Sequence, residues 1–498
     1  MNNNTPILVA AAQLVQRFTT GEMPQHPLAL MEKAARQALD TLPKSISSQI
    51  DSLQVVNVFS YTYKDAPRAL AEQLALQPSA FVYSEIGGNT PQYLVNQAAL
   101  ALAQGKAKAV LITGAEAMYG YSKAMRSGLK LDWPAKAAPE YINGSQRLGS
   151  TELENSYDLY LPTNMYPLFE TALEAEPGYD IAKIGALYAR FSEVAAQNPY
   201  AWTQERYSPE QIVSPSDDNR YIAYPYTKRL TANINTDQAA AVVMTTVGLA
   251  RQLGIDEAQW VYLRGGAAAN DVWEVSARPN LAESPAIAYA AQQALQQAGS
   301  RLEDIDAFDL YSCFPSAVQI ALKAIGLTID DPRPLSLTGS LAYFGGPGNN
   351  YSLHAIATAV ERLQQGTHQQ VMVTALGWFV TKHAIGVYGK KPGLQAWENY
   401  DPQTDIEAQN QIDASAWMSA QAEYTGEMQV EAYSLLFNRN GQPEKAIVLG
   451  RIGEKQRTLA ILNAETLDLT TLPTYQLVGK KIQVAYQVEK KRNFVVKC

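Results

Sequence analysis

The sequence predicts an α/β fold made of two similar, layered halves, with an inserted loop region and an additional β-rich segment towards the C-terminus. The main observation is an internal repeat, because the segment 34–39 (AARQAL) recurs as 290–295 (AAQQAL). Each copy is followed by a short loop and by an apolar run that begins with Ile-Asp, at 50–51 and at 305–306. Such repeats indicate duplicated structural units that bury a shared core.

The repeat continues downstream with a second helix and a second strand. An Ala-rich segment before the apolar run 109–114 is matched by the Ala-rich segment 355–363 before the run 370–375. Two copies of a helix, strand, helix, strand unit predict two similar layered sheets with right-handed, mostly parallel crossovers.

The composition argues against several classes of protein. Of the 498 residues, 47% are hydrophobic and 18% are charged, which is typical of a globular protein of two to four domains. The formal net charge of -8 argues against a nucleic-acid partner for the whole molecule. No apolar run reaches the roughly 18 residues that span a bilayer, and the N-terminus lacks a signal-peptide pattern. We therefore expect a cytoplasmic protein that has no membrane partner.

The cysteines and histidines give no indication of a metal site. Two cysteines, Cys313 and Cys498, are too few for a disulfide framework or a structural zinc site. The histidines do not stand at metal-ligand spacing: His26, His354, His368 and His383. We expect no bound metal and no bound cofactor.

Short apolar runs and helical periodicity predict the elements of the first half. A buried strand at 7–12 precedes a helix at 27–42, and further strands are expected at 55–59, 82–86 and 108–114.

The pattern changes between about 119 and 233. Tyr, Pro and Asn become more frequent, the repeat has no counterpart, and a helix such as 180–197 stands alone. We interpret this segment as an insertion that shapes a binding site, and the alternative is an insertion that only decorates the scaffold. We assign 1–235, including the insertion, to the N-terminal half.

The second half is expected at 236–393. Its candidate strands lie at 239–246, 260–265, 307–314 and 370–377.

The segment 394–498 is predicted to form an additional β-rich domain. Alternating or clustered apolar residues favour strands at 430–436, 446–452, 458–462 and 481–488. Its lysine-rich end is typical of a solvated basic rim, and a weak surface for anions or single-stranded nucleic acid is the alternative.

Chemistry in a duplicated α/β fold is expected where strands end and helices begin, because free amide hydrogens and the helix dipole favour anionic groups there. Four such loops stand out, at 85–92, 311–316, 338–350 and 375–379. The third is dense in glycine, which lets the backbone approach a ligand closely. For each loop the alternative is a tight turn between packed elements.

With these motifs in order, the sequence resembles the thiolase superfamily over about residues 5–390. The run 114–118 after a strand and the loop 339–353 look like their thiolase counterparts. The chain is most similar to thiolase-like proteins of type 1, which carry an added C-terminal β domain. The resemblance implies coenzyme A thioesters as ligands, with an acetyl-CoA acetyltransferase-like role in lipid metabolism.

The departures from this family concern its reactive residues. The nucleophilic cysteine of thiolases would fall at 88–90, where there is no cysteine, and their Gly-His-Pro motif falls on 345–347, which reads Gly-Gly-Pro. Their second cysteine falls near Ala375, and their Asn-Glu-Ala-Phe loop aligns with 311–314. Because Claisen chemistry needs a thiolate and a second acid or base, ordinary thiolase turnover is not expected.

If the chemistry has moved to other residues, the candidate catalytic residues are Cys313, with His354 as its base, and His383. Each has a simpler interpretation, since a lone buried cysteine is more often inert and His383 more often structural.

Candidate substrate-binding residues follow from the loops that the resemblance brings together. Their amide groups would hold a thioester carbonyl or phosphates: Asn89, Thr90, Gly345, Gly346, Asn349, Asn350 and Gly377.

Two functions from different classes follow. The leading hypothesis is an acyl-CoA-binding protein of the thiolase type, with altered acyltransferase activity left open. The alternative is a non-catalytic scaffold or binding protein whose C-terminal domain recruits a protein partner.

Overall fold

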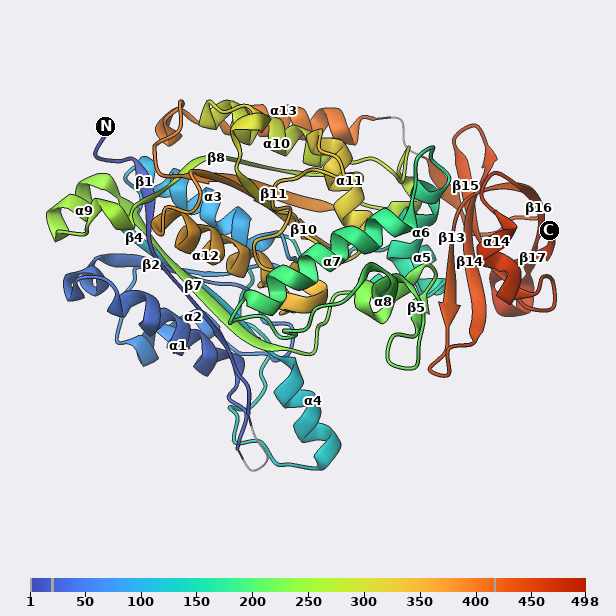
Figure 1. Ribbon diagram of the computed structural model, residues 1–498, viewed down its shortest axis with the longest axis horizontal. Helices are drawn as coiled ribbons and strands as arrows, with labels where there is room; N and C mark the ends of the chain where they lie inside the picture. Colours follow the sequence, from blue (N-terminus) through green and yellow to red (C-terminus); the bar gives the residue numbers. More distant parts are fainter. Residues whose placement is uncertain (1, 19–21, 416–417) are drawn as a thin grey trace.

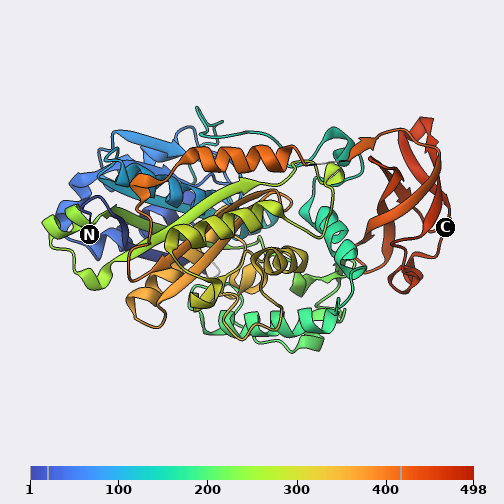
Figure 2. The ribbon, with the colours of Figure 1, turned by 90° about the horizontal axis from the view of Figure 1, so that it is seen from above.

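Strands and helices form a layered body, and a β-barrel domain lies at one end of it. The computed structural model describes residues 2–18, 22–415 and 418–498. In Figure 1 the body occupies the left and centre and the C-terminal strands stand at the right. Figure 2 shows the same division from above, with the two ends of the chain at opposite ends of the molecule.

The first half of the body has the strand order β3-β2-β4-β7-β1. Its strands are β1 (Pro6–Val15), β2 (Ile50–Val55), β3 (Ala80–Tyr83), β4 (Ala109–Ala117) and β7 (Asp237–Thr246). Strands β4 and β7 are buried along nearly their whole length, which explains why both read as continuous apolar runs.

The second half repeats this arrangement in the order β9-β10-β11-β8, which corresponds to β2-β4-β7-β1. Its strands are β8 (Val261–Asn270), β9 (Ala307–Asp309), β10 (Gln370–Gly377) and β11 (Lys382–Gly389). The amide of Phe308 donates to Pro334 O at 2.8 Å and that of Leu310 to Leu335 O at 3.0 Å. Residues 334–335 thus lie beside β9 in the position that β3 has beside β2. Because the two halves share this strand order, the predicted duplication is confirmed.

The two halves are joined edge to edge, although the sequence suggested two separate sheets. Strands β1 and β8 pair only through Ile7 with Tyr262 and Leu8 with Val261, which makes one nine-stranded path. Both strands are buried, so their backbone N–H and C=O groups need hydrogen-bond partners. At these residues each strand provides such partners for the other.

Helices cover both faces of the body and also lie between its halves. The outer helices are α1 (Pro27–Asp40), α2 (Ala66–Leu74), α9 (Val247–Leu253), α10 (Pro285–Ala298) and α11 (Pro315–Ile325). The inner helices, α3 (Thr90–Ala103) and α12 (Tyr351–Gln364), touch each other and strands of both halves. The repeated segments lie in α1 and α10, where Ala34, Ala35, Ala290 and Ala294 are fully buried.

Four predicted strands differ from the structure. The sequence assigns 239–246 to the second copy, but β7 pairs with β4 and β1 of the first half. Strand β2 ends at Val55, before most of the predicted 55–59, and β3 ends at Tyr83, before most of the predicted 82–86. Strand β9 ends at Asp309, although the prediction is 307–314. Apolar residues continue into buried loops after β2 and β9, and hydrophobicity alone does not mark where pairing stops.

The inserted region contains helices and two short strands. These are α4 (Met118–Ser127), α5 (Glu152–Ser156), α6 (Pro162–Glu174), α7 (Ile181–Gln197), α8 (Pro209–Val213), β5 (Tyr221–Ala223) and β6 (Tyr226–Thr227). Helix α4 projects from the lower side of the body in Figure 1. Helix α6 packs against β13 (Gly426–Phe437) of the barrel, so the insertion connects body and barrel.

The C-terminal strands form a closed ring in which β13, β14, β15, β17 and β16 pair in turn and β16 returns to β13. The elements are β12 (Ser419–Gln421), β13 (Gly426–Phe437), β14 (Pro443–Gly453), β15 (Gln456–Leu462), α14 (Leu472–Tyr475), β16 (Lys481–Gln487) and β17 (Arg492–Lys497). Before them, α13 (Pro402–Asp413) packs on β8 and α10 of the body. The predicted β-rich character of the C-terminal domain is confirmed.

One hydrophobic core continues from the body into the barrel. The same cluster contains Phe314 of the body, Phe169 of α6, and Leu436 and Ile461 of the barrel. The barrel is therefore fixed to the body through α6 rather than joined by a free linker.

Candidate functional site

The loops predicted to carry chemistry do converge, where the start of α3 meets the end of β10 and the start of β11. The amide of Gly87 donates to Asn349 Oδ1 at 2.9 Å, and Asn349 Nδ2 donates to Asn57 O at 2.8 Å. Asn350 Nδ2 donates to Gly114 O at 2.8 Å. Both asparagines therefore connect loops of the two halves instead of facing open space.

Cys313 lies in a buried, apolar setting. Its side chain is 8% exposed, and burial raises its pKa to about 12, although a hydrogen bond with the Tyr166 hydroxyl opposes this. A thiol in this state carries almost no thiolate at neutral pH, and the thiolate is the reactive form.

His354 does not serve Cys313 as a base. Its Nδ1 shares a hydrogen bond of 2.9 Å with Gln13 Oε1, and its ring packs against Phe344. Complete burial lowers the pKa of His354 to about 3. No hydrogen bond joins it to Cys313 within the described part of the chain.

The space beside Gly88 is filled by protein. A Cβ atom added at Gly88 would lie 2.1 Å from the Tyr311 hydroxyl and 2.6 Å from Leu376 O. Tyr311 is buried and packs edge-on against Tyr351. At this place the converging loops leave no room for a ligand.

The glycines of the 338–350 loop also face packed protein. A Cβ atom at Gly345 would lie 2.6 Å from Gln238 Oε1, and the amide of Gly346 donates to Asn233 O at 2.8 Å. Their role is close packing of the loop against the strands of the first half.

A large cavity lies on the other side of α3, and we call it the α3 cavity. Its volume is about 760 Å³, and it is bounded by α3, the edge at 82–85, the insertion at 143–145, β8, the start of β11 and α13. Three of the predicted site residues line it: Asn89, Thr90 and His383. The other seven do not: Cys313, His354, Gly345, Gly346, Asn349, Asn350 and Gly377.

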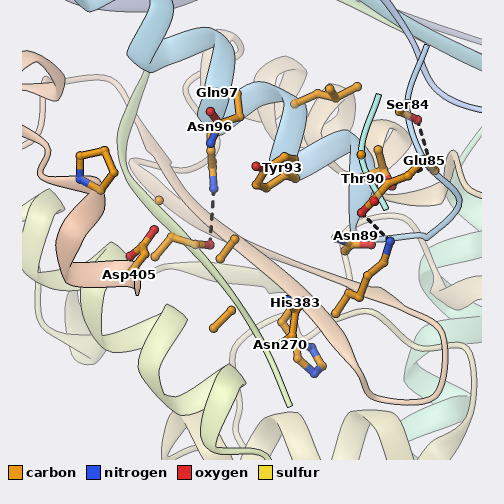
Figure 3. A pocket seen from close by; sticks show the side chains of 18 of the residues that line it. Ser84, Glu85, Asn89, Thr90, Tyr93, Asn96, Gln97, Asn270, His383 and Asp405 are labelled. Atoms are coloured by element: carbon orange, nitrogen blue, oxygen red, sulfur yellow. Dashed lines mark hydrogen bonds and ion pairs between the residues drawn. The ribbon is translucent and has the colours of Figure 1, made fainter. Parts of the chain in front are cut away.

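Figure 3 shows how side chains surround this cavity. Glu85, Asn89 and Thr90 gather at one end and Asp405 lies at the other, with Tyr93 between them. His383 is held in place, because its Nε2 lies 3.1 Å from Asp271 Oδ2 and that carboxylate also accepts from Ser284 and the amide of Ala286.

The polar groups of the α3 cavity are mostly uncharged. Carboxamides from Asn89, Asn96, Asn143 and Asn270 face it, and Tyr93 adds a hydroxyl-bearing ring. The side-chain oxygen of Asn89 is buried and has no hydrogen-bond partner among the residues that the structure describes. A buried acceptor without a partner is costly, and a donor from a ligand would satisfy it.

Sequence reasoning missed an ion pair at the edge of this cavity. Lys382 Nζ lies 2.7 Å from Glu85 Oε1 and donates to Ile86 O at 2.7 Å, and only 3% of the lysine side chain is exposed. No pattern in the sequence marks this pair, because Glu85 and Lys382 lie 297 positions apart along the chain.

The described residues show neither a metal-binding cluster nor a membrane-spanning helix. They contain no group of three or more His, Cys, Asp or Glu side chains that could hold a metal ion. Across 2–18, 22–415 and 418–498, no helix is both long enough and apolar enough to cross a membrane.

Two protein-family models match the chain. Residues 407–488 match the "Thiolase-like protein type 1 additional C-terminal domain", and residues 267–331 match the "Thiolase C-terminal domain-like" family. No curated protein gives a significant match.

Solved structures give fuller matches. A monomeric SCP2-thiolase like protein type 1 from Mycobacterium smegmatis is 30% identical with a TM-score of 0.84, and the match covers 100% of both chains. The Ltp2-ChsH2(DUF35) aldolase is 20% identical with a TM-score of 0.58, covering 78% of this chain and 98% of that one. The peroxisomal thiolase of Saccharomyces cerevisiae is 15% identical with a TM-score of 0.58, over 78% and 98%. The last two matches support the fold alone.

Proposed function

Because the chain belongs to the type 1 thiolase-like proteins of the thiolase superfamily, we propose that it binds an acyl thioester of coenzyme A without forming a covalent acyl-enzyme. The observation that carries this proposal is the α3 cavity, which reaches the start of α3 at Asn89. Its volume of about 760 Å³ is in the range of pockets that hold small-molecule ligands.

The chemistry of the cavity wall suits the middle part of such a ligand. The pantetheine arm of coenzyme A is uncharged and carries two amides and a hydroxyl, and carboxamide side chains pair with these groups. The unpartnered oxygen of Asn89 would accept one of its N–H groups. Apolar wall from Leu94 and Leu100 is available to an acyl chain.

The phosphates of coenzyme A would remain outside the cavity. An adjoining groove of about 370 Å³ contains Arg147 and Trp273, and Ser145 and Trp273 line both spaces. The guanidinium of Arg147 lies 4.7 Å from the centre of the Trp273 ring and is paired with Glu274, so a phosphate would have to displace this carboxylate to bind Arg147.

Acyl transfer through Cys313 is not part of this proposal. The thiol has a pKa of about 12 and no base beside it, so it lacks both requirements for nucleophilic catalysis. Mass spectrometry after incubation with acetyl-CoA should show no adduct on Cys313.

Calorimetry tests the binding directly. Acetyl-CoA should bind the native protein, and Ala268→Trp should weaken binding at least about tenfold, because Ala268 lines the cavity and an indole would fill it. Ala258→Trp, at an exposed residue outside the cavity, is the matched control. No heat at millimolar acetyl-CoA, or equal affinity in Ala268→Trp, would contradict the proposal.

A further inference from the structure

Lys382 occupies a place that an ordinary surface lysine would not. It stands at the start of β11, 3% of its side chain is exposed, and it lines the α3 cavity next to Asn89. Burial lowers its pKa, an effect that the carboxylate of Glu85 opposes. The ammonium also donates to Ile86 O at 2.7 Å.

Two glycines make the room that Lys382 occupies. A Cβ atom at Gly87 would lie 2.8 Å from Lys382 Cε and 2.9 Å from Nζ, and one at Gly377 would lie 3.0 Å from Cε. The same added atoms would approach Asn89 Oδ1. Asn89 and Lys382 therefore share a slot that exists only because both neighbours lack side chains.

A group that can exchange a proton with Lys382 is already in contact. Glu85 Oε1 lies 2.7 Å from Nζ, and Glu85 also lines the cavity. On the other side, the side-chain oxygen of Asn89 is buried without a partner. Amine, carboxylate and free acceptor thus meet at one end of the cavity (Figure 3).

We propose that Lys382 is an amine nucleophile that forms an imine with a ketone or aldehyde group in the α3 cavity. The ammonium gives a proton to Glu85, and the free amine forms a bond to the carbonyl carbon as the C=O π bond breaks. The carbonyl oxygen takes up the proton that the attacking nitrogen then releases. The hydroxyl of the resulting carbinolamine donates to Asn89 Oδ1. It leaves as water with the proton from Glu85, and the nitrogen lone pair completes a protonated imine. The net change is ammonium plus carbonyl to iminium plus water, so no oxidant or reductant is needed.

This inference deepens the proposed function, since it concerns the same cavity, but it has its own test. A thioester carbonyl would acylate an amine irreversibly, whereas a ketone or aldehyde gives a reversible imine. The ligand class is therefore a carbonyl compound such as a 3-oxoacyl thioester, in which the ketone is the group that reacts.

Reductive trapping tests the inference on the full-length protein. The protein is incubated with butanal, which carries no thioester, and separately with acetoacetyl-CoA, each with cyanoborohydride, and modified lysines are located by peptide mass spectrometry. We expect Lys382 to be alkylated at least about tenfold faster than the exposed Lys106, because burial lowers the pKa of Lys382 and Glu85 lies beside it as a general acid and base.

Two variants separate a reactive lysine from a structural one. Lys382→Arg keeps the positive charge and should lose the label, and Glu85→Gln keeps the shape and should slow labelling at least about tenfold. Labelling of Lys382 no faster than that of Lys106 in the native protein would overturn the inference, even if either variant fails to fold. If acetyl-CoA binds but Lys382 is not labelled, the proposed function stands and the inference about Lys382 fails. If Lys382 is labelled but acetyl-CoA does not bind, the inference about Lys382 stands and the proposed function fails.

Discussion

At the scale of single residues, the slot between Gly87 and Gly377 shows how closely this site is packed. Gly377 lies in β10, and an added Cβ atom would come within 2.4 Å of Asn89 Oδ1 and 3.0 Å of Lys382 Cε. The Asn89 side chain and the Lys382 stem would both have to move, although each is buried.

Gly377→Ala should therefore lower the free energy of unfolding by about 1 to 3 kcal/mol, the usual cost of overfilling a packed interior. Urea denaturation measures the change. Gly453→Ala is the control, since its Cβ atom would first meet the end of the flexible Gln456 side chain at 3.1 Å. Equal stability of the two variants would show that the slot is wider than described.

The two cysteines differ in their surroundings, and this predicts their reactivity. Cys313 is buried and its pKa is about 12, whereas Cys498 is only partly buried. Iodoacetamide at pH 8 should modify Cys498 in the native protein and both cysteines after denaturation, as read by peptide mass spectrometry. Fast labelling of native Cys313 would mean that its thiolate is accessible after all.

The burial of His354 predicts how stability depends on pH. The folded protein holds its pKa at about 3, whereas its value in the unfolded chain is the ordinary 6.5. The unfolded state binds the extra proton between these values, so stability falls as the pH drops from 6.5 towards 3, by up to about 1.4 kcal/mol per pH unit. Above pH 6.5 this histidine contributes no slope.

His354→Gln removes that group and should flatten the acid side of the stability profile. The measurement is the difference in unfolding free energy between the variant and the original protein from pH 4 to pH 8. Buried Glu116 and Glu170, each with a pKa raised to about 7, act in the opposite direction, and because both proteins keep them, their contribution cancels. A difference that does not vary with pH would contradict the assigned state of His354.

Sequence reasoning reached part of the candidate site and not its chemistry. Asn89, Thr90 and His383 line the α3 cavity, because residues at the start of a helix or beside a strand end are placed by the fold itself. The protonation states of Cys313 and His354 depend on which distant side chains bury them, such as Tyr166 and Phe344. Lys382 was passed over because its partner Glu85 is remote in sequence.

At the scale of elements, α13 covers the α3 cavity with few apolar contacts. Ile412 is its one buried residue, and it packs with Ala269 and Ala286. Gln409 adds two hydrogen bonds to the backbone of Asn270, accepting from its N at 2.7 Å and donating to its O at 2.9 Å. The helix is thus held on β8 mainly by polar contacts, which water can replace.

Gln409→Ala should loosen α13 without disturbing the body. Amide hydrogen exchange of 402–413 should become faster, by about fivefold to tenfold for the loss of roughly 1 kcal/mol of net hydrogen bonding, while exchange in α10 stays unchanged. Gln403→Ala is the control, because this exposed residue pairs only with Glu407 through its side chain. Unchanged exchange in Gln409→Ala would mean that other contacts hold the helix.

The sequence predicts the helices and strands that have a strong periodic pattern, but it does not predict the residues at which several strands end. The duplicated helices α1 and α10 follow from alanines that recur on one buried face. The ends of β2 and β9 were missed because the following loops are buried too, and there Glu116 accepts from the amides of Phe59 and Ser60 in place of a neighbouring strand. The pairing of β1 with β8 could not be read from either strand alone.

At the scale of the whole molecule, body and barrel share a core through the insertion. Thr171 of α6 exchanges hydrogen bonds with the backbone of Tyr433, accepting and donating at 2.9 Å, and the amide of Asn493 donates to the Tyr157 hydroxyl at 2.8 Å. The sequence predicted a distinct C-terminal domain but could not show that the insertion was its partner, since the two are far apart along the chain.

Heating should therefore unfold body and barrel together. Differential scanning calorimetry should give one main transition, because body and barrel share the hydrophobic core that contains Phe169 and Leu436. Unfolding of either part would expose apolar surface of the other part to water. Two well-separated transitions would indicate that the barrel is independent.

The closed ring of the barrel has one further consequence, for association between molecules. Strand β17 pairs with β16 on one side and with β15 at Ile461 on the other, next to the short stretch of β15 that pairs with β12. Without β17, β16 and the end of β15 would each have an open edge, and open edges of this kind can pair with strands of another molecule. Closure by β17 therefore protects the barrel from edge-to-edge aggregation.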